Sequence, residues 1–157
     1  MKMNVKLNEG VSMPTYGTSG SAAFDLAAEK DYVIRNINAE QKAVMVSTGV
    51  SVAIPKGYAG FLYLRSSMCK TTMRMSNHVG VIDSDYRGVI HVPIEVNART
   101  VCTIEKGERI AQLVITKVEQ MDLVAVDDLD KTVRGAGGFG STNKPKRKSK
   151  TAHEVTT

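Results

Sequence analysis

Short apolar runs recur between residues 32 and 115, separated by glycine, proline, asparagine or aspartate. Several of them alternate apolar and polar positions, which is the period of a strand with one buried face. Helical periodicity is weak, and we expect one short helix over 68–72, capped by Ser66 and Ser67. The pattern predicts an all-β sandwich or barrel, with strands at 32–34, 43–46, 49–54, 60–64, 79–82, 89–96, 101–104 and 110–115.

The stretch 77–88 interrupts this pattern, because it places two carboxylates, a tyrosine and an arginine between glycines. We expect the strands on either side to form a hairpin, with the polar residues on its turn. Asp83 and Asp85 are two positions apart and would repel each other on one face of a strand. Such a pair needs a cation, a bound phosphate–metal complex or a water to be activated. A merely solvated turn is the alternative that these residues leave open.

Histidine and cysteine residues do not form a metal-binding pattern in this sequence. Cys69 and Cys102 have no paired spacing and no histidine cluster nearby, which argues against a disulfide scaffold and a zinc site. His91 alternates with apolar neighbours in the predicted strand 89–96. Periodicity alone therefore favours a surface position for His91 over a ligand role.

The length and the charge distribution indicate one domain with a basic end. A chain of 157 residues can bury roughly 70% of its unfolded surface as a single domain. No apolar run is long enough for a membrane span or a secretory signal, so we expect an intracellular protein, cytoplasmic or nuclear, without membrane contact. The net charge is +5, but residues 144–157 hold five basic residues and one acidic residue. This disordered tail is interpreted as a nuclear-import signal, a nucleic-acid contact or only a solubilising end.

Residues 130–143 lose the strand pattern, because four glycines surround one phenylalanine and few apolar side chains remain. A flexible linker is the simplest interpretation of such a stretch. However, Arg134 offers a cation for phosphate and Phe139 a ring for stacking, on a backbone free to approach a ligand closely. We therefore expect a β domain at 1–129, an arm at 130–143 that orders on binding, and the tail at 144–157.

Five separated segments, in order from about residue 19 to residue 142, resemble the motifs of the trimeric deoxyuridine triphosphatase (dUTPase) family. Two departures occur: Ala23 stands where the family commonly has glycine, and Leu64 replaces the common proline. The segments are Ala-Ala-Phe-Asp-Leu-Ala-Ala at 22–28, Leu-Arg-Ser-Ser at 64–67, the stretch 77–88, Gly-Glu-Arg-Ile-Ala-Gln at 107–112, and residues 134–142 within the arm.

The resemblance implies a jelly-roll-like β subunit with one short helix, a flexible C-terminal arm and a homotrimer whose active sites are shared between subunits. It also implies hydrolysis of dUTP to dUMP and pyrophosphate, with Mg²⁺ on the triphosphate. That reaction limits uracil in DNA and supplies dUMP for dTMP synthesis. The arm of one subunit would lie over a site formed by others.

The resemblance also assigns roles to residues. Asp83 would activate the water that attacks the α-phosphorus, and Gln112 and Arg134 would complete the catalytic set. Asp25 would contact Mg²⁺ through water, whereas Asp85 receives no role. The expected substrate-binding residues, for phosphate, sugar or uracil, are Arg65, Ser66, Ser67, Asn77, Gly80, Val81, Ile82, Tyr86, His91, Phe139, Ser141 and Thr142.

Three other functions fit parts of the sequence. A catalytically weak, regulatory nucleotide-binding protein can share the fold, but the presence of Asp83, Gln112 and Arg134 together argues against it. A dCTP deaminase also shares the fold, and the intact 83–88 segment favours the hydrolase. A nucleic-acid-binding module is motivated by the basic tail alone.

Overall fold

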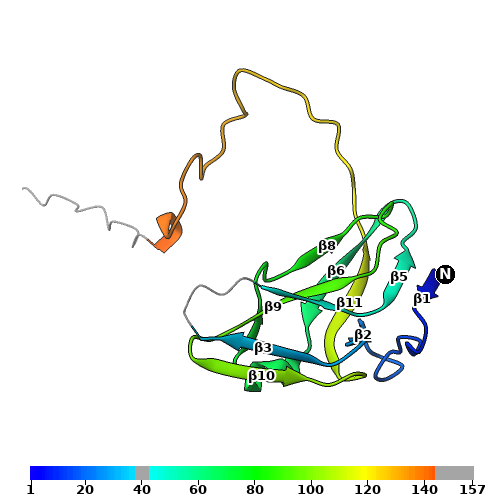
Figure 1. Ribbon diagram of the computed structural model, residues 1–157. Helices are drawn as coiled ribbons and strands as arrows, with labels where there is room; N and C mark the ends of the chain where they lie inside the picture. Colours follow the sequence, from blue (N-terminus) through cyan, green and yellow to red (C-terminus); the bar gives the residue numbers. More distant parts are fainter. Residues whose placement is uncertain (38–42, 144–157) are drawn as a thin grey trace, which may run out of the picture. The chain divides into compact units, whose positions relative to one another are not determined.

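The computed structural model describes residues 1–37 and 43–143, and the predicted tail at 144–157 lies outside the described residues (Figure 1). The described part is all-β, as predicted, apart from two short 3-10 helices. In chain order the elements are β1 (Asn4–Leu7), β2 (Phe24–Ala27), β3 (Tyr32–Asn36), β4 (Val44–Ser47), β5 (Val50–Ala53), β6 (Tyr58–Leu64), η1 (Ser66–Lys70), β7 (Met73–Met75), β8 (Gly80–Ile82), β9 (His91–Val96), β10 (Thr100–Ile104), β11 (Arg109–Lys117) and η2 (Ser141–Asn143).

The chain divides into two compact units, Met1–Gln120 and Met121–Thr157. The first unit holds all the strands of the described residues, and the second holds η2 after a run without regular structure. Within the part of the chain that the structure describes, no helix has the length and apolar character that a membrane span requires.

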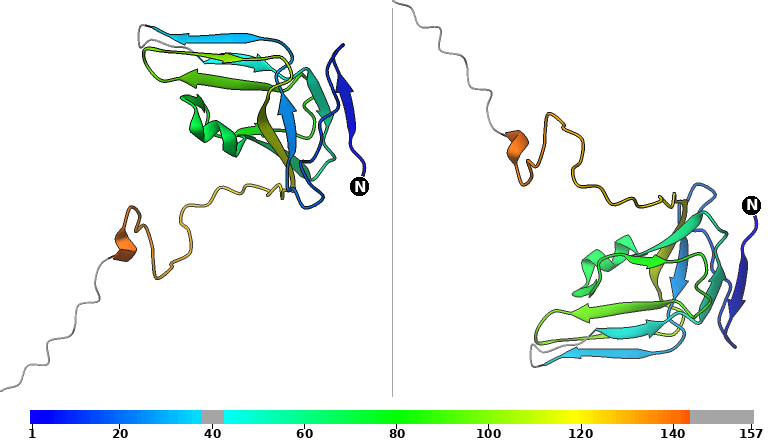
Figure 2. Two further views of the ribbon diagram at one scale, coloured as in Figure 1. Left: turned by 90° about the horizontal axis from the view of Figure 1, so that it is seen from below. Right: turned by 90° about the horizontal axis from the view of Figure 1, so that it is seen from above.

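The first unit is built from antiparallel strand pairs. A four-stranded sheet has the order β2-β11-β6-β8, a three-stranded sheet has the order β4-β9-β7, and β1-β5 and β10-β3 form two further pairs. Apolar side chains from these sheets join in one core, with strands on two sides of it (Figure 2). Leu26, Leu62 and Leu113 come from the four-stranded sheet, and Val92 and Ile94 come from β9.

The strand register decides which side chains leave the core. Leu113 on β11 lies opposite Leu62 on β6, and both are buried. Their neighbour Gln112 lies opposite Asp25 on β2 and Tyr63 on β6, on the outer face. Because successive side chains of a strand point to opposite faces, the same alternation that fills the core places Asp25 beside Gln112.

The predicted hairpin around Asp83 and Asp85 is wrong, because β8 pairs with β6 whereas β9 pairs with β4 and β7. Just before β9 begins, the backbone of Ile90 makes hydrogen bonds with residues at the start of β5. Its N–H donates to Val50 O at 2.8 Å, and its carbonyl accepts from Thr48 N at 3.1 Å. The two aspartates therefore lie on a loop that crosses between sheets, and not on the turn of a ribbon.

The eight predicted strands are confirmed as β3, β4, β5, β6, β8, β9, β10 and β11, with ends shifted by a few residues, whereas β1, β2 and β7 were not predicted. The predicted helix is present as the 3-10 helix η1, which begins at Ser66. Its N-cap is Arg65, and no side chain caps it, so the expected serine cap is wrong. Buried Met68 anchors the helix to the core instead.

Candidate active site

Three charged residues from three motif segments meet on the outer face of the four-stranded sheet. Asp25 Oδ1 accepts from Arg65 Nε at 2.9 Å, and Asp25 Oδ2 accepts from Arg109 Nη1 at 3.0 Å. The Asp25 side chain is 10% exposed, whereas the side chains of Arg65 and Arg109 are 28% and 55% exposed. The cluster carries a net charge of +1 and presents guanidinium N–H groups to solvent, which suits the binding of an anion.

The backbone around Arg65 is fixed by its neighbours. Arg65 N donates to Ile110 O on β11, and Gln112 Nε2 donates to Leu64 O at 3.1 Å. Ser66 and Ser67 follow at the exposed start of η1. The structure thus brings the predicted substrate-binding residues Arg65, Ser66 and Ser67 near Gln112, a residue of the predicted catalytic set up to 47 positions away in the chain.

The loop after β8 is held by its own hydrogen bonds. Tyr86 N donates to Asp83 O at 3.2 Å, which closes a turn through Asp85. Arg87 Nη1 donates to Ser84 O at 2.7 Å and to Tyr86 O at 2.9 Å. These bonds fix the backbone of the loop, and the side chains of Asp83 and Asp85 remain exposed.

Tyr86 is held in place from two directions. Its hydroxyl donates to Val89 O at 3.1 Å, and His91 Nδ1 lies 2.9 Å from the same oxygen. A Cβ added at Gly88 would lie 2.3 Å from the Tyr86 hydroxyl oxygen and 2.6 Å from Cζ. Only glycine at position 88 therefore leaves room for this position of the ring.

A cavity of about 220 Å³ opens beside this loop. It contains four predicted substrate-binding residues and the predicted base, together with Met45 and Ile90, which had no predicted role. His91 lies on the exposed face of β9, as its alternation with buried Ile90 and Val92 predicted. The lining residues are Met45, Val81, Ile82, Asp83, Tyr86, Ile90 and His91.

Asn77 and Gly80 flank the entrance to β8. Val79 N donates to Asn77 O at 2.6 Å, and His78 between them has a φ of 58°, a left-handed conformation that is uncommon for a residue other than glycine. A Cβ at Gly80 would lie 3.2 Å from Leu62 Cβ. The backbone of 77–80 is therefore tightly folded, with Asn77 exposed at its turn.

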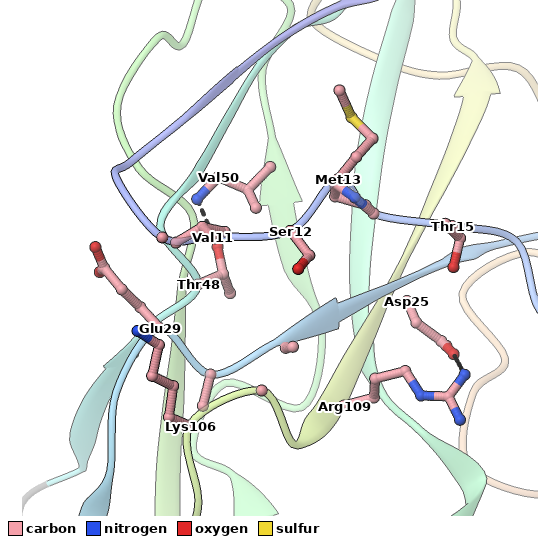
Figure 3. A pocket seen from close by; sticks show the side chains of 15 residues that line it. Val11, Ser12, Met13, Thr15, Asp25, Glu29, Thr48, Val50, Lys106 and Arg109 are labelled. Atoms are coloured by element: carbon pink, nitrogen blue, oxygen red, sulfur yellow. Dashed lines mark hydrogen bonds and ion pairs between the residues drawn. The ribbon is translucent and has the colours of Figure 1, made fainter.

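A larger pocket of about 490 Å³ is lined by residues 10–15 and by residues of β2 (Figure 3). Asp25 and Arg109 stand at one end of it, and Glu29 and Lys106 stand at the other (Figure 3). Hydrogen bonds from the Ser47 hydroxyl and the Asn8 amide hold the pKa of Glu29 below its usual value.

The arm residues lie in the second unit and are described within it. Arg134 Nε donates to Gly137 O at 2.8 Å, and Gly137 N donates to Arg134 O at 3.1 Å, so this side chain folds onto its own turn. A Cβ at Gly137 would meet Ser141 Oγ at 2.8 Å. Phe139 and Thr142 are exposed, and Ser141 is half-buried.

Within one chain, the arginine cluster lies far from the loop that carries Asp83. Asp25 on β2 and Ile82 on β8 are three strand spacings apart across the sheet, or about 14 Å. Along the strands, Asp25 is level with Tyr63, whereas Ile82 is level with Gly60, about 10 Å further on. Together these offsets separate the two sites by about 17 Å.

Sequence reasoning missed five residues of these sites: Met45, Arg87, Gly88, Ile90 and Arg109. Arg87 and Gly88 contact near neighbours in the loop, whereas Met45 and Arg109 lie on strands paired with distant parts of the chain. Asp25 and Arg109 are 84 positions apart, for example, and meet because β2 pairs with β11. Among the described residues, no group of three or more histidines, cysteines, aspartates or glutamates could hold a metal ion.

Comparison with known proteins gives one answer. A model of the dUTPase family matches residues 9–143. A deoxyuridine 5′-triphosphate nucleotidohydrolase of Fusobacterium nucleatum subsp. nucleatum is 42% identical over 146 residues, covering 91% of this chain and 99% of the relative. One of Debaryomyces hansenii is 40% identical over 139 residues, covering 87% and 84%. The solved structure of Staphylococcus bacteriophage 80alpha dUTPase with dUPNHPP has a TM-score of 0.78 at 28% identity, covering 89% of this chain and 97% of that one. The chain therefore belongs to the dUTPase family.

Proposed function

We propose that this chain hydrolyses dUTP to dUMP and pyrophosphate by attack of an activated water on the α-phosphorus. The observation that carries the proposal is the pairing of two halves of a nucleotide site. One half is the guanidinium cluster around Asp25, and the other is the 220 Å³ cavity that holds Asp83 and Tyr86. The first half suits a chain of phosphates and the second suits a small ring, so one nucleotide would occupy both.

Asp83 holds and deprotonates the attacking water. Its side chain is exposed at the cavity, on a backbone fixed by the turn to Tyr86. Its contribution comes from orientation, because a water must lie about 3–3.5 Å from the phosphorus in line with the leaving group. Gln112 orients the water or the α-phosphate.

The phosphates are bound by cations and hydroxyl groups. Arg65 uses Nε for Asp25, and its terminal nitrogens donate to phosphate oxygens. Ser66 and Ser67 donate from the start of η1, by hydroxyl or backbone N–H. Arg134 approaches the terminal phosphate from the arm, in the manner of an arginine finger.

The cavity selects the base and the sugar. The backbone of 79–82, with Gly80, Val81 and Ile82, and the Asn77 amide pair with the uracil edge, whose donors and acceptors differ from those of cytosine. Tyr86, fixed by Gly88 and Val89 O, packs under the deoxyribose and leaves no room for a 2′-hydroxyl.

Four further residues line the cavity or contact the substrate bound there. His91 borders it directly. Phe139 closes over the uracil ring from the arm, with stacking of roughly 1–3 kcal/mol. Ser141 and Thr142 contact the substrate from the same segment.

The donor groups present fit an Mg²⁺ ion that would be bound mainly by the substrate triphosphate. The described residues offer no protein cage for a metal, and Mg²⁺ commonly keeps several waters while bound mainly by substrate phosphates. Each Asp25 oxygen that accepts from an arginine retains a further lone pair, so Asp25 can accept from a metal-bound water. The ion neutralises phosphate charge, and the chain's own residues position the substrate.

A homotrimer supplies complete sites. Ile82 pairs with Gly60, so Asp83 is level with a point on β6 six positions before Arg65. By strand geometry Arg65 therefore lies about 20 Å from Asp83 of the same chain, far beyond contact with a common α-phosphorus. Val81, on β8 beside the cavity, is 60% exposed and can contact a neighbouring subunit. Each site would combine Arg65 of one subunit, Asp83 of another and an arm.

Turnover of dUTP, dCTP, dTTP and UTP with Mg²⁺ tests the function, with pyrophosphate and ammonia release measured in parallel. We expect pyrophosphate from dUTP at rates far above those for the other nucleotides. Ammonia release from dCTP would indicate a deaminase instead. Binding of dUTP without turnover would indicate a regulatory nucleotide-binding protein.

A further inference from the structure

Asp25 is a shared partner, because each of its two oxygens accepts from a different arginine. A pair of Asp25 and Arg65 alone would have no net charge, and Asp25 would weaken the attraction between Arg65 and a phosphate. Arg109 returns the net charge of the cluster to +1. It also occupies the oxygen of Asp25 that Arg65 does not use, which fixes the carboxylate plane and thereby the direction of the Arg65 Nε bond.

An irregularity in strand pairing turns the Arg109 side chain towards Asp25. The pairing of β11 with β2 is irregular between Arg109 and Ala111, and such a bulge redirects a side chain at the end of a strand. Both Ile110 and Ala111 are fully buried, so the irregularity lets two successive residues face the core while Arg109 turns out towards Asp25. A regular strand would place one of those two residues outside.

We infer that Arg109 is a positioning residue for phosphate binding: through Asp25 it orients the Arg65 guanidinium and offsets the negative charge beside it. This inference rests on the proposed function, in which Arg65 binds the substrate phosphates. It differs from a role of Asp25 towards Mg²⁺ alone, because the arrangement acts on a phosphate chain whether or not a metal is present. It also differs from a purely structural ion pair, which would change stability but not affinity.

Calorimetric titration with the non-hydrolysable analogue α,β-imido-dUTP tests the inference, with EDTA and again with Mg²⁺. We expect Arg109→Gln to raise the Kd about tenfold in both conditions, which is the effect of losing one charge-assisted contact. For dUTP turnover, KM should rise correspondingly, while kcat changes less than about threefold, because the water and its base belong to the other half of the site.

Two further variants separate charge and geometry from general damage. Arg109→Lys retains the cation and should bind within about threefold of the wild type, since one ammonium can still reach the free Asp25 oxygen. The double variant Asp25→Asn with Arg109→Gln replaces the ion pair by two amides, restores the net charge of +1 and keeps an acceptor for Arg65 Nε. It should bind better than Arg109→Gln alone. Lys117→Gln, on the exposed end of the same strand, is the matched loss of one charge and should bind like the wild type.

An unchanged Kd in Arg109→Gln, with or without a lower Tm, overturns the inference. So does an effect seen with Mg²⁺ but absent with EDTA, because the role would then belong to the metal. Failure of Arg109→Lys and of the double variant to recover affinity would also overturn it. If the wild-type chain neither binds the analogue nor hydrolyses dUTP, the proposed function itself fails, and that result is distinct from wild-type activity with unaffected Arg109 variants.

Discussion

Two inactive variants of this chain should restore activity when their subunits are mixed. Arg65→Gln removes the proposed phosphate-binding cation, and Asp83→Asn removes the proposed base. Strand geometry separates these groups by about 20 Å within one chain, whereas chemistry requires the reacting atoms about 3–3.5 Å apart. The proposed homotrimer therefore places the two groups that serve one substrate in different subunits.

The recovered activity can be worked out from this arrangement. In a symmetric oligomer reassembled at random from equal amounts of the two variants, a site draws intact Arg65 from one subunit and intact Asp83 from the next. About one quarter of the sites then have both groups. We expect pyrophosphate release from dUTP to recover to about that fraction of the wild-type rate after joint denaturation and refolding.

The controls distinguish shared sites from sites within one chain. Each variant refolded alone should stay inactive, and variants mixed without refolding should recover only as fast as subunits exchange. The double variant Arg65→Gln with Asp83→Asn, refolded with an equal amount of wild type, should leave about one quarter of the sites active if sites are shared, but about one half if each site lies in one chain. If the co-refolded variants show no more activity than the two variants measured separately, the sites are not shared between subunits.

Three further predictions follow from individual contacts. Truncation before Arg134 should leave an oligomer of unchanged size and circular dichroism, with kcat reduced by at least about 10²-fold because the arginine of the arm is lost; an unfolded or monomeric product would contradict the proposed role of the arm. Gly88→Ala should displace the Tyr86 ring, since a Cβ there would lie 2.3 Å from its hydroxyl. The ratio of kcat/KM for dUTP to kcat/KM for UTP should then fall about tenfold or more. An unchanged ratio would exclude Tyr86 as the residue that rejects the 2′-hydroxyl. The pKa of Glu29 is lowered chiefly by the Ser47 hydroxyl, so its stabilising contribution is present above the unfolded pKa and is lost as the pH falls through the folded pKa. Urea unfolding at pH 7 and below pH 4 should therefore show a smaller loss of stability in Glu29→Gln than in the wild type, and equal losses would exclude this contribution.

The strands were predictable wherever burial alternates along a run long enough to show a period. In β9, for example, Val92, Ile94 and Val96 are buried, and His91 is exposed. The strand β7 has three residues, too few for an alternation to be distinguished from chance. In β2 the alternation is present, with Phe24 and Leu26 buried, but two apolar positions do not separate a strand from a loop.

The pairing of strands was not predictable from the local pattern. The hairpin expected around Asp83 and Asp85 was wrong because the partners of β8 and β9 are chosen by burial against distant strands. For the same reason the contact of Asp25 with Arg109 could not be read from the sequence. The identity of the motif residues was visible in the sequence, whereas their partners depend on the register of β11 with its two neighbours.

The most direct test of the mechanism is Asp83→Asn, compared with Asp85→Asn in the same loop. Both substitutions remove one carboxylate from an exposed position, so their effects on folding and on long-range charge are matched. We expect Asp83→Asn to bind α,β-imido-dUTP within about threefold of the wild type and to lose about 10²–10⁴-fold in kcat, the range for removal of a general base. Asp85→Asn should retain most of the wild-type kcat. If Asp83→Asn retains its kcat instead, Asp83 is not the base and the account is contradicted.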